Sequence, residues 1–311
     1  MGIRRLPFAL LAGALALVVA ATFWLATASG ETRIATPAGA ATSAVSSSPQ
    51  STATQTAAST PSASSSAAVT LTPVATPTSP TTLALSLAAL GVSGTVSVAV
   101  YDLDDSDQLT AGGGSYETAS IVKVDILVSL LVQRNGSLTT SQKSLARSMI
   151  TISDNDAATT LFQAVGSTTG LNRTNRTLGL IETSAGTNGN WGLTRTTAAD
   201  QIRLLKLIFL PNNTLSDASR AYVSSLMSSV SEAQDWGVTA AADAEETSAV
   251  KNGWLQRSTT GLWDVTSIGC VEAKGHHLLV AVLVTSAKSE GVGISTIEKA
   301  ASAGVARVIT A

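Results

Sequence analysis

The sequence is poor in the residues from which metal and redox sites are usually built. Its 311 residues include one cysteine, Cys270, and two histidines, His276 and His277. A single cysteine excludes an intramolecular disulfide, so we expect packing to hold the folded part together and Cys270 to be a buried, unreactive thiol. A zinc site would have too few ligands, and two adjacent histidines beside a predicted turn argue against a Ser-His-Asp triad. We therefore predict no metal site and no cofactor.

Charged residues are also scarce, at 13% of the chain against ~25% in an average soluble domain. The 19 basic and 21 acidic residues give a net charge of −2, which offers no electrostatic reason to expect a nucleic-acid partner. Little charge combined with 44% hydrophobic residues would suit a membrane protein. The charges are unevenly spread, however: none lies between Arg33 and Asp102, so the dilution belongs to the N-terminal third of the chain.

The N-terminus has the pattern of an export signal. A short basic region precedes an uncharged, mostly apolar run over residues 6–26, which ends in the small-x-small pattern Ala26-Thr27-Ala28. That pattern is typical of a signal-peptidase site, whereas the run is long for a signal-peptide core and just long enough to span a bilayer. Residues 1–30 are therefore predicted to be a cleaved signal peptide or an N-terminal membrane anchor. Either one exports the protein to the cell envelope or the extracellular space.

Residues 31–82 consist almost entirely of Ala, Ser, Thr, Pro, Gln and Val. Such a segment has too little apolar surface to offset its chain entropy, so we predict a disordered linker. It is either a plain spacer or a stalk that carries O-glycans. The rest of the chain, residues 83–311, is long enough for one folded domain with a substantial core.

Apolar periodicity predicts the elements of this domain. Residues 95–103 alternate apolar and polar side chains, as a half-buried strand does, and residues 108–111 can return as a second strand. A helix from 120 to about 133 is apolar nearly all round, which indicates a buried helix. Further helices are predicted at 139–148, 155–164, 197–209 and 215–230, strands at 248–255, 263–272 and 278–284, and a closing helix at 294–308. This order fits an α+β fold, with an antiparallel sheet flanked by helices and an all-helical subdomain.

The segment Glu117-Thr118-Ala119-Ser120-Ile121-Val122-Lys123 carries the first chemical signal. If a helix begins near Ser120, its hydroxyl sits at the positive end and Lys123 lies one turn on, on the same face. A serine becomes a nucleophile beside a base, and a buried, neutral lysine can be that base. Ser-x-x-Lys alone is equally a capping serine followed by a surface lysine.

Two further motifs favour the catalytic interpretation of Ser120 and Lys123. Ser153-Asp154-Asn155 falls between two predicted helices, and Lys251-Asn252-Gly253 lies on a predicted strand. Together, in this order and on these elements, the three motifs resemble the Ser-x-x-Lys, Ser-Asp-Asn and Lys-Thr-Gly set of the penicillin-recognising serine enzymes. Residues 95–311 are similar to a class A β-lactamase-like serine hydrolase, and this resemblance implies the β-lactamase/transpeptidase-like fold.

The resemblance implies a role for each motif residue. Ser120 would be the acylated nucleophile, Lys123 its base or proton relay, and Ser153 the proton shuttle to the leaving nitrogen. The backbone N–H of Ser120 and one that follows Gly253 would form the oxyanion hole.

The remaining motif residues would bind substrate. Asn155 would hold the side-chain amide of the substrate, and Lys251, with Asn252 and Gly253 beside it, would attract the substrate carboxylate. Asp154 would be a structural hydrogen-bonding residue.

Two departures from the family bear on the activity. The Glu-x-x-Leu-Asn segment, whose glutamate activates the water that frees the acyl-enzyme, is absent between Leu178 and Thr196, where the only acid is Glu182. Glu182 is either a solvated loop residue or a replacement base, and loss of a positioned base typically costs ~10²–10⁴ in rate. In addition, Asn252 stands where the family has Thr, and Trp254 could narrow the cleft.

The sequence therefore predicts an exported serine hydrolase, expected to be a monomer. It would form an acyl-enzyme with β-lactams or with D-alanyl peptides of peptidoglycan, and would deacylate slowly. The alternative is a non-catalytic cell-envelope binding protein that retains the fold.

Overall fold

The computed structural model describes residues 82–244 and 246–310. The predicted export segment, residues 1–30, and the predicted linker up to residue 81 lie outside the described residues. Within the described ranges, no helix combines the length and the apolar character needed to cross a membrane. Thr82, the last residue of the predicted linker, belongs instead to the first strand, β1 (Thr82–Leu83).

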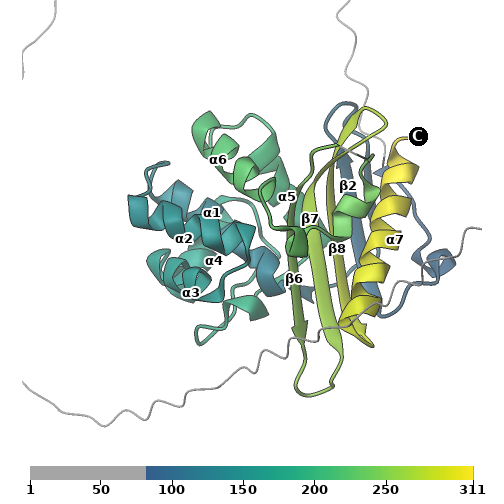
Figure 1. Ribbon diagram of the computed structural model, residues 1–311, viewed down its shortest axis with the longest axis horizontal. Helices are drawn as coiled ribbons and strands as arrows, with labels where there is room; N and C mark the ends of the chain where they lie inside the picture. The colour runs from purple at the N-terminus through teal and green to yellow at the C-terminus, as the bar shows by residue number, and fades with distance from the viewer. Residues whose placement is uncertain (1–81, 245, 311) are drawn as a thin grey trace, which may run out of the picture. The chain divides into compact units, whose positions relative to one another are not determined.

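A six-stranded sheet is the centre of the fold (Figure 1). Its order is β1-β3-β2-β8-β7-β6, and every neighbouring pair is antiparallel except β1 with β3. The other strands are β2 (Thr95–Asp102), β3 (Gln108–Ala111), β6 (Ala249–Gln256), β7 (Trp263–Ala273) and β8 (His276–Ala287). The first long strand thus pairs with the last, which confirms the predicted α+β fold with an antiparallel sheet. Two short strands, β4 (Tyr116–Glu117) and β5 (Arg195–Thr196), form a separate pair.

Helices cover both faces of the sheet. Figure 1 shows α7 (Glu290–Val308) on one face and α5 (Ala198–Phe209), with the other helices, on the opposite side. Val98 and Val100 belong to the apolar cluster under α7, and Ala99 belongs to the cluster on the other face. The prediction of a half-buried β2 was therefore wrong: helices exclude water from both faces of that strand.

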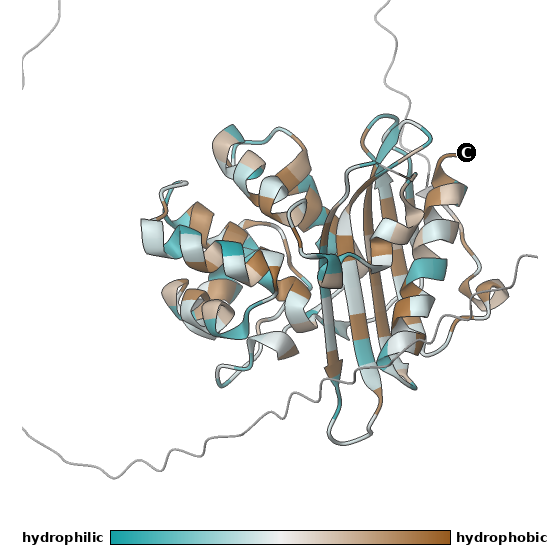
Figure 2. Cartoon of the chain, viewed as in Figure 1, coloured by the Kyte–Doolittle hydropathy of each residue, from teal (hydrophilic) through white to brown (hydrophobic). Residues whose placement is uncertain are grey.

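The helix α1 (Val122–Gln133) forms the core of the helical part, and almost all its residues are buried, as its all-round apolar character predicted. It contacts four neighbouring helices, α2 (Thr140–Thr151), α3 (Asn155–Ala164), α4 (Ser167–Thr177) and α6 (Asp217–Met227). Figure 2 shows apolar residues along the strands and hydrophilic residues on the outward sides of these helices.

The helix α4 was not predicted from the sequence. Eight of its eleven residues are Ser, Thr, Asn or Gly, which are weaker helix formers than Ala or Leu, and it has no apolar run. Its buried side chains include Leu171 and Asn175, and the Asn175 amide donates to Asp125 of α1 at 3.0 Å. Tertiary contacts rather than helix propensity therefore stabilise α4.

The turn predicted at residues 273–276 is confirmed. β7 ends at Ala273 and β8 begins at His276, so the hairpin loop is Lys274-Gly275. Both loop residues have positive φ, 51° and 79°. Two consecutive positive φ angles are the signature of a type I′ turn, and its twist matches that of the flanking strands.

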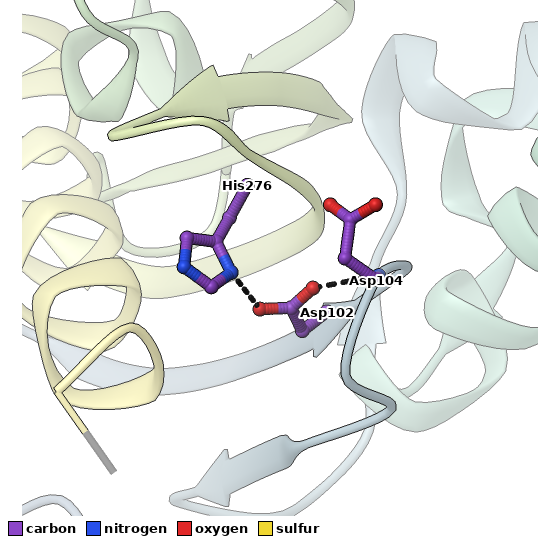
Figure 3. A group of neighbouring side chains, drawn as sticks. All are labelled: Asp102, Asp104 and His276. Atoms are coloured by element: carbon purple, nitrogen blue, oxygen red, sulfur yellow. Dashed lines mark hydrogen bonds and ion pairs between the residues drawn. The ribbon is translucent and has the colours of Figure 1, made fainter.

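His276 joins this hairpin to the turn between β2 and β3 (Figure 3), and the backbone N–H of His277 donates to Asp104 Oδ2 of the same turn at 2.8 Å. His276 Nδ1 lies 2.7 Å from Asp102 Oδ2, and Asp102 Oδ1 accepts the backbone N–H of Asp104 at 2.8 Å. Asp102, Asp104 and His276 each bring one potential metal-ligand atom within 4.8 Å of the others, a grouping that the sequence did not lead us to expect. The Asp102 oxygens are engaged in holding the turn to the hairpin, so we assign the cluster a structural role.

Cys270 lies on β7 as a half-buried free thiol, less enclosed than predicted. Burial raises its pKa to about 12, and the nearby carboxylates of Asp104 and Glu272 act in the same direction. A thiol with so high a pKa is a poor nucleophile at neutral pH, which agrees with the inert role predicted for it.

Candidate active site

A tight turn in front of α1 presents Ser120. The 3-10 helix Ala119–Ile121 carries it and continues directly into α1, so Ser120 lies just before the α-helix rather than inside it. Ala119 has a φ of 47°, a left-handed conformation that costs a non-glycine residue ~1–3 kcal/mol and persists only where the surroundings impose it. The Ser120 residue is half-buried.

Strand β6 is pressed against this turn. A Cβ atom on Gly253 would meet the backbone nitrogen of Ser120 at 2.4 Å and the carbonyl oxygen of Thr118 at 2.8 Å. On the neighbouring strand, the Thr266 hydroxyl donates to the same Thr118 carbonyl at 2.8 Å. The predicted glycine therefore has a physical reason: only a residue without a side chain lets β6 approach the Ser120 turn so closely.

Lys123 is completely buried and makes three contacts with the second motif. Its Nζ donates to the Ser153 carbonyl oxygen at 2.6 Å, to Ser153 Oγ at 3.0 Å and to Asn155 Oδ1 at 2.8 Å. Burial lowers the pKa of Lys123 to about 7, against the opposing field of the Asp154 carboxylate. A large fraction of Lys123 is therefore neutral near pH 7, as a base beside Ser120 must be.

Lys251 reaches the same hydroxyl from β6. Its Nζ donates to Ser153 Oγ at 3.0 Å and to the Asn252 carbonyl oxygen at 2.8 Å, and its side chain is 1% exposed. Burial, and secondly the charge of Lys123, hold the pKa of Lys251 well below its ordinary value. The structure thus brings two lysines and Ser153 to one point, immediately beside the Ser120 turn.

The middle motif is shaped by the start of α3. Ser153 has a φ of 58°, and Asp154 is the N-cap of α3, where Oδ1 accepts the Ala157 N–H at 2.9 Å. This is the structural role predicted for Asp154. The cap fixes the backbone so that the neighbouring Ser153 and Asn155 side chains both reach Lys123.

Asn252 is placed differently from what its predicted role requires. Its fully buried amide donates to the backbone carbonyls of Gln234 and Trp236 at 2.8 and 2.9 Å, and its Oδ1 has no hydrogen-bond partner among the described residues. Alternate residues of a strand point to opposite faces, so Asn252 points away from Lys251. The structure brings Lys251 and Gly253 to the Ser120 turn but turns the Asn252 amide to the other side of β6.

Trp254 also lies on that other side. Its ring packs edge-to-face on Trp236 with centroids 5.7 Å apart, against the apolar cluster that contains Val250. The expected narrowing of the cleft by Trp254 is therefore not seen on the Lys251 side of β6.

Glu182 does not contact the lysines through its carboxylate in the described structure. The side chain is exposed and accepts a hydrogen bond from the Thr197 hydroxyl, the N-cap of α5, at 3.3 Å. Its backbone N–H donates to the buried Asp200 at 2.8 Å. These contacts fit the solvated loop residue better than a replacement base.

The group that covers Lys123 is Trp191, which was not among the predicted site residues. The Lys123 Nζ lies 4.9 Å from the centre of its ring, and the indole N–H donates to Thr159 Oγ1 of α3 at 3.1 Å. The only signal in the sequence is that Trp191 falls in the loop where the family motif is missing.

Comparison with known proteins assigns the family. The profile described as "Beta-lactamase enzyme family" matches residues 130–308, more than half of the chain. The chain belongs to the beta-lactamase enzyme family. It is a serine hydrolase of the β-lactamase-like type, and the match begins inside α1, after Ser120 and Lys123. No curated protein matches this family member.

Solved structures agree on the fold of this β-lactamase family member. A PBP-A mutant, solved as an acyl-enzyme complex with penicillin G, is 20% identical with a TM-score of 0.60, over 70% of this chain and 91% of that one. A β-lactamase from Burkholderia vietnamiensis is 20% identical with a TM-score of 0.62, over 72% and 96%. TLA-3 extended-spectrum β-lactamase is 19% identical with a TM-score of 0.60, over 68% and 91%. At this identity they establish the β-lactamase/transpeptidase-like fold.

Proposed function

We propose that the protein is an exported serine hydrolase in which Ser120 forms a covalent acyl-enzyme with β-lactams or D-alanyl peptides, and that this intermediate is long-lived. One observation carries the proposal: Lys123 and Lys251 both donate to Ser153 Oγ at 3.0 Å beside the Ser120 turn. A buried pair of lysines is costly for a fold to maintain, and perturbed pKa values of this kind concentrate at functional sites.

The acylation step follows from this geometry. Ser120 Oγ attacks the carbonyl carbon of the lactam or peptide bond while its proton passes to the neutral Lys123 amine. The carbonyl oxygen gains negative charge, which the Ser120 N–H and an N–H after Gly253 would stabilise. The C–N bond then breaks, Ser153 gives its proton to the leaving nitrogen, and Lys123 returns a proton to Ser153. The product is an ester on Ser120.

Release of the acyl group requires water to attack that ester, which yields the acid and restores the Ser120 hydroxyl. The water needs a base, and the Glu-x-x-Leu-Asn motif that supplies it in class A enzymes is absent from residues 179–195. Loss of such a base costs ~10²–10⁴ in rate. We therefore expect an adduct that survives for minutes or longer.

The test is covalent labelling with a fluorescent penicillin. Wild type should be labelled, Ser120→Ala should not, and the label should be lost slowly after excess reagent is removed. Turnover at the speed of an efficient lactamase would contradict the slow step. A complete absence of Ser120-dependent label would contradict the acyl-enzyme itself.

A second candidate, a non-catalytic envelope binding protein, is favoured by the orientation of Asn252. Its amide is committed to backbone carbonyls and not to the site. If wild type shows no label, binding of unlabelled peptidoglycan fragments, with equal affinity in wild type and Ser120→Ala, would support this candidate.

Export is part of the proposal and is supported by the basic region, the apolar run over 6–26 and the Ala26-Thr27-Ala28 pattern. Fractionation of cells that express the full chain tests it. The protein should be recovered outside the cytoplasm, and its mass reports whether the segment is cleaved or kept as an anchor.

A further inference from the structure

Trp191 covers one side of the Lys123 side-chain nitrogen in the described structure. A lysine ammonium has three N–H donors, and those of Lys123 go to Ser153 O, Ser153 Oγ and Asn155 Oδ1. The ring of Trp191 lies over Nζ at 4.9 Å, and Lys123 has no exposed surface. The ring is therefore part of the wall that encloses this amine.

The position of the ring is fixed from outside the site. The indole N–H donates to Thr159 Oγ1 at 3.1 Å, and Thr159 in turn donates to the backbone of Asn155 at 3.0 Å. Trp191 is the first residue of a short 3-10 helix, Trp191–Leu193, and backbone hydrogen bonds at the end of this helix help to hold it in place. The loop thus holds the indole against α3 and over α1 at the same time.

We propose that Trp191 is a positioning residue that caps Lys123 and keeps water from the Lys123 amine and from the ester on Ser120. This inference rests on the proposed function and deepens it, because it names a residue that prolongs the acyl-enzyme. Lys123 lies three residues after Ser120, at the start of the helix that the Ser120 turn leads into. A water that reached its free amine would have a general base beside the ester, and an aromatic face excludes that water while giving it no hydrogen-bond partner.

The cap also sets the pH at which Ser120 reacts. The Asp154 carboxylate at the start of α3 opposes the lowering of the Lys123 pKa, and Lys123 in turn lowers the pKa of Lys251 on β6. Removal of the ring leaves both in place and admits water to the amine. Hydration favours the charged form, so the pKa of Lys123 should rise toward its ordinary value.

The experiment compares wild type with Trp191→Ala and Trp191→Phe in the labelling assay. In Trp191→Ala we expect the penicillin label to be lost about tenfold faster or more, and the rise of labelling rate with pH to move to higher pH. Trp191→Phe keeps an aromatic face over Lys123 and should resemble wild type in both readouts. Thr159→Val removes the indole's partner without touching the ring and should give an intermediate lifetime.

A direct readout separates this inference from the proposed function. In protein with isotope-labelled lysine, NMR follows the Lys123 side chain without any substrate. Wild type and Trp191→Phe should show ring-shifted Lys123 signals, whereas Trp191→Ala should lose the shift and titrate at higher pH. Unchanged Lys123 titration and label lifetime in folded Trp191→Ala would overturn the cap. Absence of label in wild type, with the NMR change present, would overturn the proposed function and leave the cap of Lys123 standing.

Discussion

At the residue scale, the Ser153 hydroxyl is central to the proposed reaction, because both buried lysines donate to it. A hydroxyl has two acceptor positions and one donor hydrogen, and the two ammonium groups of Lys123 and Lys251 occupy both acceptor positions. The hydrogen of Ser153 must then point away from both lysines. Ser153 is thereby prepared to donate to the leaving nitrogen of a substrate, and the charge of the second lysine makes that donation easier.

The sequence motifs predicted the residues of the candidate site but did not predict the orientation of the Asn252 side chain. Motif spacing identifies residues that lie near one another, as Ser120, Lys123, Ser153 and Lys251 do. It does not tell which of two strand faces has a spare carbonyl for an amide to bind. That information lies in the loop that carries Gln234 and Trp236, far from the motif in sequence.

This orientation leads to a prediction for Asn252→Thr, which would restore the family motif. The shorter side chain leaves a buried carbonyl of Gln234 or Trp236 without its donor, and an unsatisfied buried polar group costs ~1–3 kcal/mol. We expect the free energy of unfolding, measured by urea denaturation, to fall by that amount, with no gain in the rate of penicillin labelling. A stable variant that labels faster would contradict the orientation seen here.

At the scale of elements, hydrophobic periodicity predicted the helices and strands whose apolar pattern is visible in their own sequence. The buried helix α1 and the β7–β8 hairpin carry their signals locally, as an all-round apolar run and as a Lys-Gly turn. The helix α4 does not, because its stability comes from contacts such as Asn175 with Asp125. The burial of both faces of β2 was missed for the same reason, since α7 and α5 reach it from distant parts of the chain.

Strand β6 and the Ser120 turn form one unit, and Gly253 is the point at which they touch. In Gly253→Ala the added Cβ would meet Ser120 N at 2.4 Å, a distance that forces the strand and the turn apart. We expect acylation by fluorescent penicillin to slow by at least about tenfold, and the melting temperature to fall because the added Cβ clashes with backbone atoms.

Gly113→Ala is the matched control, because a Cβ at Gly113 meets nothing within 4 Å. It should label like wild type. Equal labelling of both variants would show that close approach of β6 is not needed for acylation.

At the scale of the whole domain, the buried carboxyl of Asp125 links stability to pH. Burial raises its pKa to about 7, and the charge of Asp200 adds to the shift, against hydrogen bonds from Asn175 and Ser129. In the folded domain the Asp125 carboxyl keeps its proton up to near neutral pH. In the unfolded chain it loses the proton at about pH 4, as an ordinary aspartic acid does. The contribution of the Asp125 carboxyl to the free energy of unfolding is therefore complete below about pH 4 and is lost as pH rises toward 7.

We predict that the free energy of unfolding decreases between about pH 4 and pH 7 by at most about 4 kcal/mol from this carboxyl, and that Asp125→Asn removes most of the decrease. The variant keeps a group that can accept the Asn175 amide at the same place, so its fold should be retained. Urea denaturation of both proteins across this pH range measures the effect. Since Lys123 gains neutrality over the same range, labelling should become faster while wild type becomes less stable. Parallel stability curves for wild type and variant would show that Asp125 is already ionised in the folded domain.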